Sequence, residues 1–562
     1  CPFVTENEGH KVVLLPIWKQ LRYQIPFGTV EQVIAELRSH AERDPSGMLV
    51  YADDGEKFGV WPGTHEHCYN DGWLRQFFKA IYENRDWLEI VPLGKVAGRK
   101  AAGRAHIPSA SYEEMLHWAL PPEAFVEYEQ LEKHLKDAGQ WERFGRFVRG
   151  GHWRGFLTKY EESNLMHKMM LRVSDRLADF EKRFPEKIDQ AALARDRLYA
   201  SQCNCPYWHG VFGGLYLPHI RQAVYSCMIE ADHSLRTLSG EREVTIEVYD
   251  FDADGSDEVI MADDRFTTVF RPEAGGTLVY LALNRERFNL TDTMTRRREG
   301  YHLKLTQAAM PGASKKSNSI HDLVLAKEEG LADFLIEDSY HKRCFIDHFF
   351  GDDVTLEKLQ TGTFNDEGDF VREPYEYVLL RKAPGLELVR DGQLLRAGKP
   401  VPVRVVKRFT FDPDGGRMNV AYELSSPTGG EYEVRFAVEN NFNFQAGHAD
   451  DRYLVIDRER PANSYLDSTG MHDEAYGLAM VDDYRSLAVA VGSDRPAAIW
   501  HLPIFTVSLS EGGFEKVYQG TTILHIYRLT LSSSPTKINL SLVAGTNQEV
   551  LQRAFATQTV GS

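Results

Sequence analysis

The sequence predicts a chain in three parts: an α/β segment, a helical region and a large antiparallel β-sandwich. Three observations lead to this prediction. Residues 1–100 alternate between strand-like and helix-like patterns, residues 111–237 are dominated by helical patterns, and short runs rich in β-branched and aromatic residues recur from Val244 onward. The domain boundaries expected from these changes are 1–110, 111–238 and 239–562.

The first part combines buried strand patterns with amphipathic helix patterns. Helical spacing of apolar residues occurs in Thr29–Glu42 and Asp71–Asp86, and apolar runs typical of buried strands occur at Lys11–Ile17, Gly47–Ala52 and Leu88–Leu93. This alternation indicates βαβ units with a parallel sheet. Three strands are too few to close a barrel, so we expect the sheet to be one part of a larger one.

The two later parts differ in their periodicity. Helical segments are expected at 113–118, 123–149, 161–184 and 188–200, with breaks at Pro121-Pro122 and Phe184-Pro185. Beyond Val244, strand-like runs follow one another between turn signals without long helical patterns. This arrangement is typical of an antiparallel β-sandwich, here of roughly 300 residues.

Composition excludes several classes of protein. The chain has 562 residues, is 43% hydrophobic and 26% charged, and carries a net charge of −17, which fits a folded, soluble protein and argues against nucleic acid as a partner. No run of about 18 apolar residues is present, so we expect no membrane span. The start CPFVTENEGH lacks the features of a signal peptide, and Cys1 in place of Met indicates processing or part of a longer polypeptide.

The cysteines are too few for a disulfide framework. We expect free or buried thiols in a reducing, cytoplasmic compartment at Cys1, Cys68, Cys203, Cys205, Cys227 and Cys344.

An acidic turn is the first candidate for chemistry. Asp53, Asp54 and Glu56 directly follow the apolar run 47–52, and Trp61 comes shortly afterwards. Loops at the carboxyl ends of parallel strands commonly carry catalytic groups, and a carboxylic acid there can protonate a glycosidic oxygen while Trp61 stacks on a sugar face. The alternative is an ordinary Asp-Gly turn with solvated acids.

Two further motifs contain candidate binding residues. In QCNCPYWHGVFGGLYLPHIR, Asn204, Trp208 and His209 precede a glycine-rich bend and could bind a polyol; in IPSASYEEMLHWALPPE, Trp118 could form a cleft wall. Alternatively, Trp208 and Trp118 belong to the core and His209 is a buried imidazole with satisfied hydrogen bonds.

A fourth motif resembles the opening of a calcium-binding loop. Asp250, Asp252 and Asp254 are followed by Gly255, so three carboxylates could converge on one Ca²⁺ ion, although an EF-hand is excluded because Met261 stands where its glutamate would be. A tight acidic hairpin turn is the alternative. The basic run Arg296–Arg298 is expected on a solvated face.

Together, DDGEKFGVWPGT, IPSASYEEMLHWALP and NCPYWHGVFGGLYLPHIR, followed by a long β-rich region, resemble glycoside hydrolase family 57, in particular its 4-α-glucanotransferase and α-amylase branch. The resemblance implies an incomplete (β/α)7 barrel, a helical region and a β-sandwich, acting on α-1,4-glucans with retention of configuration and requiring no cofactor.

The resemblance also implies roles for individual residues. Asp54 matches the acid/base, Glu56 and Trp61 line the cleft, and substrate-binding positions are implied at Trp118, Asn204, Trp208 and His209. One departure is Cys205: the resemblance implies Asp at this position, and a thiol cannot supply the acceptor strength of a carboxylate.

The nucleophile Glu of the family lies upstream of the acid/base, before Cys1. We therefore expect an upstream segment or chain to supply the first half of the barrel. A non-catalytic glucan-binding or assembly subunit is the alternative, and a homo-oligomer is compatible with either.

Overall fold

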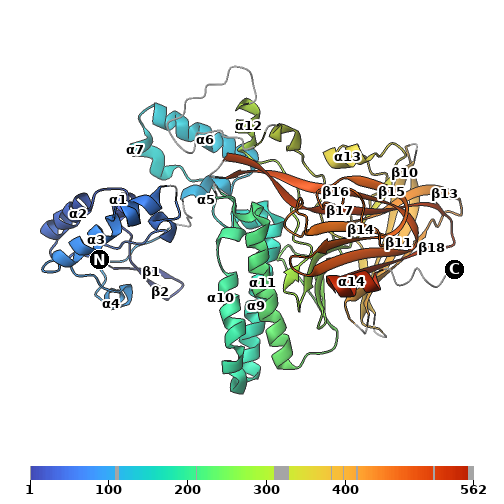
Figure 1. Ribbon diagram of the computed structural model, residues 1–562, viewed down its shortest axis with the longest axis horizontal. Coiled ribbons are helices and arrows are strands. Elements are labelled where there is room, and N and C mark those ends of the chain that lie inside the picture. The colour runs from blue at the N-terminus through green and yellow to red at the C-terminus, as the bar shows by residue number, and fades with distance from the viewer. Residues whose placement is uncertain are drawn as a thin grey trace. The chain divides into compact units, whose positions relative to one another are not determined.

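The computed structural model divides into two compact units, Cys1–Ala110 and Ser111–Ser562, which are described separately (Figure 1). The structure describes residues 2–61, 63–107, 113–210, 212–308, 328, 330–380, 383–396, 398–412, 415–510 and 513–554. Cys1, Ser109, Ser111 and Tyr112 lie outside these residues.

Unit 1 (Cys1–Ala110) is mainly helical. Its helices are α1 (Lys19–Gln24), α2 (Val30–Arg43), α3 (Trp73–Glu83) and α4 (Leu93–Ala97), and a hairpin is formed by β1 (Phe3–Asn7) and β2 (His10–Leu14). The helices predicted at 29–42 and 71–86 are confirmed as α2 and α3. Thr29 begins α2 with a capping box, in which its side chain and that of Gln32 each accept the other's backbone N–H.

The predicted parallel strands of unit 1 are mostly wrong. The run 11–17 enters an antiparallel hairpin, and 47–52 and 88–93 form no ladder; among the described residues only the single parallel bridges Ile17–Val50 and Val4–Arg104 remain. A parallel strand needs partners along its length and cover on both faces. Val12 and Ile90 instead stay 59% and 68% exposed, so apolar character alone does not create a sheet.

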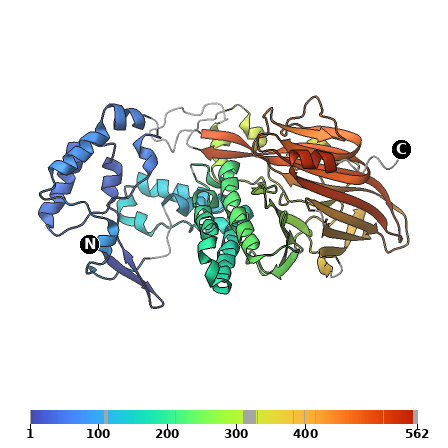
Figure 2. The ribbon, with the colours of Figure 1, turned by 60° about the horizontal axis from the view of Figure 1, so that its bottom comes forward.

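The helical region of unit 2 (Ser111–Ser562) confirms the predicted pattern, with different ends. The 123–149 segment, for example, is divided, because α6 ends at Asp137. Figures 1 and 2 both show α9, α10 and α11 side by side as an elongated bundle. None of the described helices is long and apolar enough to cross a membrane. The helices are α5 (Glu113–Trp118), α6 (Pro122–Asp137), α7 (Trp141–Phe144), α8 (Gly155–Lys159), α9 (Glu161–Arg183), α10 (Ala192–Ser201) and α11 (Pro218–Ser239).

Two antiparallel sheets follow in unit 2, as the sequence predicts for a β-rich region. The smaller sheet has five strands in the order β3-β4-β5-β6-β7, with bounds Thr245–Tyr249, Glu258–Ala262, Phe266–Arg271, Thr277–Leu283 and Phe288–Asn289.

The larger sheet has eleven strands, with the main order β8-β13-β17-β16-β18-β12-β11-β10-β9, and β15 joins β14 to β16. Its strands are β8 (Ile346–Phe350), β9 (Glu376–Leu380), β10 (Gly385–Arg396), β11 (Lys399–Phe411), β12 (Arg417–Ser425), β13 (Tyr432–Phe442), β14 (Arg452–Ile456), β15 (Gly470–Asp482), β16 (Leu487–Ser510), β17 (Gly513–Leu531) and β18 (Thr536–Thr546). Short helices α12 (His302–Ala308), α13 (Leu356–Thr361) and α14 (Asn547–Arg553) lie between or after the strands.

One apolar core joins the two sheets. Phe270 of β5 packs on Phe409 of β11 with ring centroids 4.7 Å apart, and Phe266 packs on Phe411 at 5.8 Å. Alternating burial along β12 shows the expected period of two, with one face of the strand in this core.

A charged group lies inside this core and is fully bonded. Lys407 of β11 is completely buried, and its Nζ lies 2.8 Å from Asp347 Oδ2 and donates to the backbone carbonyls of Gly275 and Phe345 at 2.9 Å. Asp347 also accepts hydrogen bonds from the hydroxyls of Tyr375 and Tyr422, at 2.7 and 2.9 Å. Such a network specifies one arrangement of β8, β9 and β12 around β11.

Lys407→Met tests this network. We expect a loss of about 3–5 kcal/mol in the free energy of unfolding, measured in urea, because Asp347 would stay buried without its cation. Arg404→Met, on the same strand, removes the partner of the exposed Asp391 and should cost less than about 1 kcal/mol. Equal losses in the two variants would contradict the role of the buried pair.

Candidate active site

The acidic turn of unit 1 contains one carboxylate that is fully bonded. The Asp53 side chain is 1% exposed and accepts hydrogen bonds from Lys57 Nζ at 2.8 Å, Arg22 Nε at 3.0 Å and the Tyr51 hydroxyl at 3.2 Å. Burial alone would raise the pKa of Asp53, but the hydrogen bonds from Lys57, from the backbone N–H of Asp54 and from Arg22 hold that pKa below its ordinary value. Asp53 is therefore an ionised anchor for the turn.

The neighbouring carboxylate is presented to solvent. The Asp54 side chain is 52% exposed, and Arg22 Nη2 lies 3.1 Å from its Oδ2. Its backbone N–H donates to Asp53 Oδ1 at 2.9 Å, so Asp53 also fixes the backbone from which the Asp54 side chain projects. Glu56, on the 3₁₀ turn Gly55–Phe58, is exposed as well.

An aromatic pair stands beside this turn. The rings of Trp61 and Phe27 are stacked, 6.1 Å apart and inclined by 20°, and Lys57 Nζ lies 5.6 Å from the Trp61 ring. Phe27 is 51% exposed. Lys57 thus joins the acid cluster to an exposed aromatic surface, which is the kind of surface on which a sugar face stacks.

The second group of predicted residues lies on the 204–216 loop of unit 2. Asn204 and Cys205 are exposed, with Cys205 Sγ 3.6 Å from Asn204 Oδ1. Trp208 is half-buried against Phe156, and its Nε1 has no hydrogen-bond acceptor among the described residues. Free thiols are found, as predicted, at Cys68, Cys203, Cys227 and Cys344 in the described part of the chain.

His209 is a buried imidazole with satisfied hydrogen bonds, which is the alternative interpretation of its motif. It is fully buried, with Nδ1 2.7 Å from the carbonyl oxygen of Gly213 and Nε2 2.8 Å from the hydroxyl of Tyr301. Burial lowers its pKa to about 4. Trp118 is also buried, at 6% exposure, and meets the imidazole edge-on at 5.1 Å. These two residues belong to the buried core that supports the loop. Their contact with substrate stays a prediction.

A buried ion pair holds the loop and Trp118 together. Lys159 Nζ lies 2.8 Å from Glu299 Oε2 and donates to the carbonyl oxygen of Trp118 at 3.1 Å. Glu299 Oε1 accepts from the hydroxyls of Tyr160 and Tyr216, at 2.8 and 2.7 Å. Burial would raise the pKa of Glu299, but the charge and hydrogen bond of Lys159 help to lower it to about 2, so Glu299 is ionised.

The basic run 296–298 lies only in part on the solvated face that the sequence predicts: the Arg298 side chain is 52% exposed, but the other two are not. Arg296 is 4% exposed and forms an ion pair with Asp338 at 2.6 Å, and Arg297 pairs with Glu162 at 2.8 Å. Their carboxylate partners compensate the cost of burying the guanidinium groups. These partners cannot be recognised from a local sequence pattern, because both lie more than 40 positions away.

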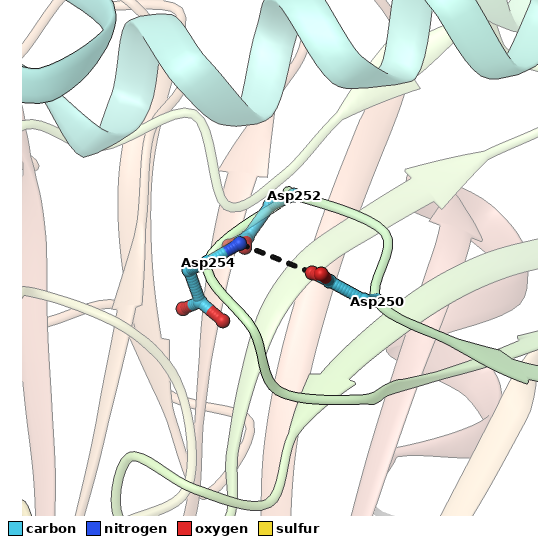
Figure 3. A group of neighbouring side chains, drawn as sticks. All are labelled: Asp250, Asp252 and Asp254. Carbon is cyan, nitrogen blue, oxygen red and sulfur yellow. Dashed lines mark hydrogen bonds between the residues drawn. The ribbon is translucent and has the colours of Figure 1, made fainter.

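The acidic loop 250–254 forms a compact turn (Figure 3). One oxygen from each of Asp250, Asp252 and Asp254 lies within 4.8 Å of the others, as a shared cation would require. However, Asp250 accepts the backbone N–H groups of Asp254 and Gly255, at 3.0 and 3.2 Å, and Arg271 pairs with both Asp252 and Asp254. Protein groups therefore satisfy most of the turn, while Asp252 Oδ1 is buried without a hydrogen-bond donor among the described residues. Ca²⁺ binding stays a prediction.

Sequence reasoning missed the residues that position the candidates. These are Arg22 and Lys57 in unit 1 and Lys159, Tyr216, Glu299 and Tyr301 in unit 2. Lys57 carried a usable signal, because it follows Asp53 by four residues. Glu299 carried none, since Lys159 precedes it by 140 positions.

His209→Gln tests the buried imidazole. Between pH 6.5 and 4 the unfolded chain binds a proton at this position that the native protein does not, so the free energy of unfolding falls as the pH falls. We expect the variant to lose up to about 1.4 kcal/mol per pH unit of this dependence, measured by urea unfolding between pH 4.5 and 6.5. The exposed His448→Gln is the control; an unchanged slope in His209→Gln would contradict the assignment.

Three family models match consecutive parts of the chain. Residues 1–105 match Glycosyl hydrolase family 57, residues 151–235 match the middle domain of Alpha-amylase/4-alpha-glucanotransferase, and residues 250–541 match the C-terminal domain of the same description.

Named relatives resemble nearly the whole chain. It is 35% identical to Alpha-amylase 1 of Dictyoglomus thermophilum, covering 95% of this chain and 75% of that protein, and 34% identical to 4-alpha-glucanotransferase of Thermococcus litoralis, covering 94% and 73%. The crystal structure of the latter enzyme matches with a TM-score of 0.74 at 32% identity, over 96% of this chain and 74% of that chain. The chain therefore belongs to glycosyl hydrolase family 57.

Proposed function

We propose that the protein acts on α-1,4-glucans as a retaining glycoside hydrolase or 4-α-glucanotransferase, with Asp54 as its acid/base. Family membership supports the reaction class, and the named relatives are an α-amylase and a 4-α-glucanotransferase. The observation that carries the residue assignment is the contrast between the two adjacent carboxylates: Asp53 is fully bonded, whereas Asp54 is half-exposed beside the Trp61–Phe27 pair.

In the proposed mechanism, Asp54 donates its proton to the glycosidic oxygen as the bond to the anomeric carbon breaks. A second carboxylate, about 5–5.5 Å away, forms the glycosyl-enzyme. Asp54 then removes a proton from the acceptor hydroxyl, which attacks the anomeric carbon and releases the sugar with its original configuration. Glu56 is an unsuitable nucleophile, because it follows Asp54 by two residues on the same turn and would meet the sugar from the acid's side.

We infer that another segment supplies the nucleophile and completes a (β/α)7-type barrel with unit 1. The apolar residues of unit 1 that remain uncovered support this: Val60 is 77% exposed, Ile90 68% and Ile107 52%. The single parallel bridges at Val50 and Arg104 mark edges where further strands could pair. The segment is either part of the same polypeptide or a separate chain.

The remaining predicted residues are proposed as sugar contacts. Glu56 and Trp61 would line the cleft near the acid/base, while Asn204 and Trp208 would bind further sugars with His209 and Trp118 behind them. The Nε1 atom of Trp208 is buried without an acceptor among the described residues, so Trp208 would meet a sugar through its ring. Cys205 offers a thiol, which is a much weaker acceptor than the carboxylate of the relatives.

Asp54→Asn is expected to lower kcat on maltooligosaccharides by about 10²–10⁴-fold in the complete protein that contains this chain, because general acid–base catalysis is lost. A 4-nitrophenyl maltoside should lose less in its first step, since its leaving group needs no proton, and azide should restore turnover by replacing the activated acceptor. Glu83→Gln, at an exposed position of α3 that has no proposed role in binding, is the control.

Unchanged turnover in Asp54→Asn would contradict the acid/base assignment. If the unsubstituted protein binds glucan without turnover, the non-catalytic binding subunit is correct instead.

Retention predicts that the first products from maltotriose are α-anomers, detectable by proton NMR before mutarotation. Longer maltooligosaccharides together with glucose would identify a sugar 4-hydroxyl as the acceptor, whereas glucose and maltose without elongation would identify water. Initial release of the β-anomer would overturn the retaining mechanism.

A further inference from the structure

A surface hollow lies within unit 2, and the residues that line it are far in sequence from Asp54. It has a volume of about 510 Å³ and is bordered by five segments: the beginning of α11, the turn between β6 and β7, the loop after β13, the turn between β15 and β16 and the end of β18. This volume lies within the range of small-ligand sites, about 300–1,000 Å³. The function proposed above makes no use of it.

The backbone around this hollow has unusual conformations. Arg287, Gln445 and Ser486 line it with positive φ angles of 57°, 69° and 56°. They are three of the eight described non-glycine residues in this region of φ. Left-handed backbone costs of order 1–3 kcal/mol for such residues and concentrates at functional sites. Glycine would relieve the strain, yet each position carries a polar side chain.

The side of the hollow formed by α11 contains a hydrogen-bond acceptor that has no donor among the described residues. His219, Gln222, Ala223 and Ser226 share one face of the helix and line the hollow. Gln222 is 6% exposed; its Nε2 donates to the carbonyl oxygen of Arg287 at 3.4 Å, and its Oε1 has no donor among the described residues. A buried acceptor without a donor costs about 1–3 kcal/mol, and a hydroxyl-bearing ligand in the hollow would recover this cost only by turning the Gln222 amide towards itself.

The charges of the hollow favour a neutral ligand. Arg287 pairs with Glu230 at 2.8 Å, and Arg485 pairs with Asp482 at 3.0 Å, while Glu286 adds a further carboxyl group. A phosphate or carboxylate is best bound by a guanidinium that has no other anion. Both guanidinium groups here have one, so their charge is already compensated and their remaining N–H groups can donate to neutral acceptors such as hydroxyl oxygens.

The hollow also provides apolar contact. Phe288 and Leu487 are 3% exposed and line it, and the Arg485 guanidinium lies over the Phe288 ring at 5.7 Å. The same guanidinium lies 5.5 Å from the ring of Tyr484, which is 73% exposed. Hydroxyl and amide groups above a small apolar surface match the two-sided character of a pyranose ring.

We propose that this hollow is a second glucan-binding site, which holds a part of a long glucan away from the bond that reacts. The ligand class rests on the proposed function, since the hollow itself indicates only a neutral, hydroxyl-rich molecule. A site of this kind raises the affinity for polymers through a second point of attachment and leaves short substrates unaffected.

Ala223→Trp tests the proposal by filling the hollow from an exposed position of α11. Thr237→Trp, at an exposed position near the other end of the same helix, is the matched control. Affinity electrophoresis in amylopectin gels measures polymer binding. We expect the dissociation constant to rise about tenfold for Ala223→Trp, equivalent to 1.4 kcal/mol, and to stay unchanged for Thr237→Trp, while kcat/KM on maltotriose is the same in both variants.

His219→Ala serves as the second variant if the tryptophan disturbs folding, which the thermal unfolding midpoint reveals, and it should also weaken amylopectin binding. Equal retention of both tryptophan variants, or of His219→Ala and the unsubstituted protein, would overturn the site. If the variants bind amylopectin equally well and the protein still turns over glucan, only the second site is rejected and the proposed function is kept. Binding that depends on Ala223 without any turnover would reject the proposed function and keep the site, and the absence of both would reject the two together.

Discussion

The ion pair between Lys159 and Glu299 is the interaction on which the 204–216 loop depends. It lies fully inside unit 2, where an unpaired charge would be very unfavourable, and each oxygen of Glu299 is engaged by a specific neighbour. Through Tyr216 it fixes the end of the loop, and through the Trp118 carbonyl it fixes the end of α5. The bend between them is tight: at Gly214, with φ +53°, a Cβ would lie 2.3 Å from the Trp208 carbonyl oxygen.

The acidic turn of unit 1 follows the same physical principle. A carboxylate that accepts three side-chain hydrogen bonds, Asp53, has one stable position, and its neighbour along the chain is thereby directed outwards. Lys57 contributes to the anchor and also contacts the Trp61 ring, so the acid and the aromatic surface share a support. In both units, buried charged groups position the candidate residue.

The parts that the sequence predicts well are those whose signal is local. In the helices α2, α3 and α9, the apolar residues have helical spacing and the residues that mark the helix ends lie close by in the sequence. The strands beyond Val244 are separated by turn-forming residues. The parallel strands of unit 1 fail because a strand depends on its partners, which an apolar run cannot specify.

In the candidate site, too, local features can be predicted from the sequence and those that depend on distant contacts cannot. Asp54 and Trp208 belong to recognisable motifs, but the burial of His209 and Arg296 depends on partners far along the chain, Tyr301 and Asp338. Sequence patterns indicate which residues carry chemistry, and distant contacts decide which of them reach the surface.

Everything proposed for the function depends on the Asp54 turn binding a glucan. Amide hydrogen exchange with and without maltoheptaose, in a variant of the complete protein that does not turn it over, tests this most directly. We expect the ligand to slow exchange in residues 53–61. Unchanged exchange in these residues would contradict the proposal.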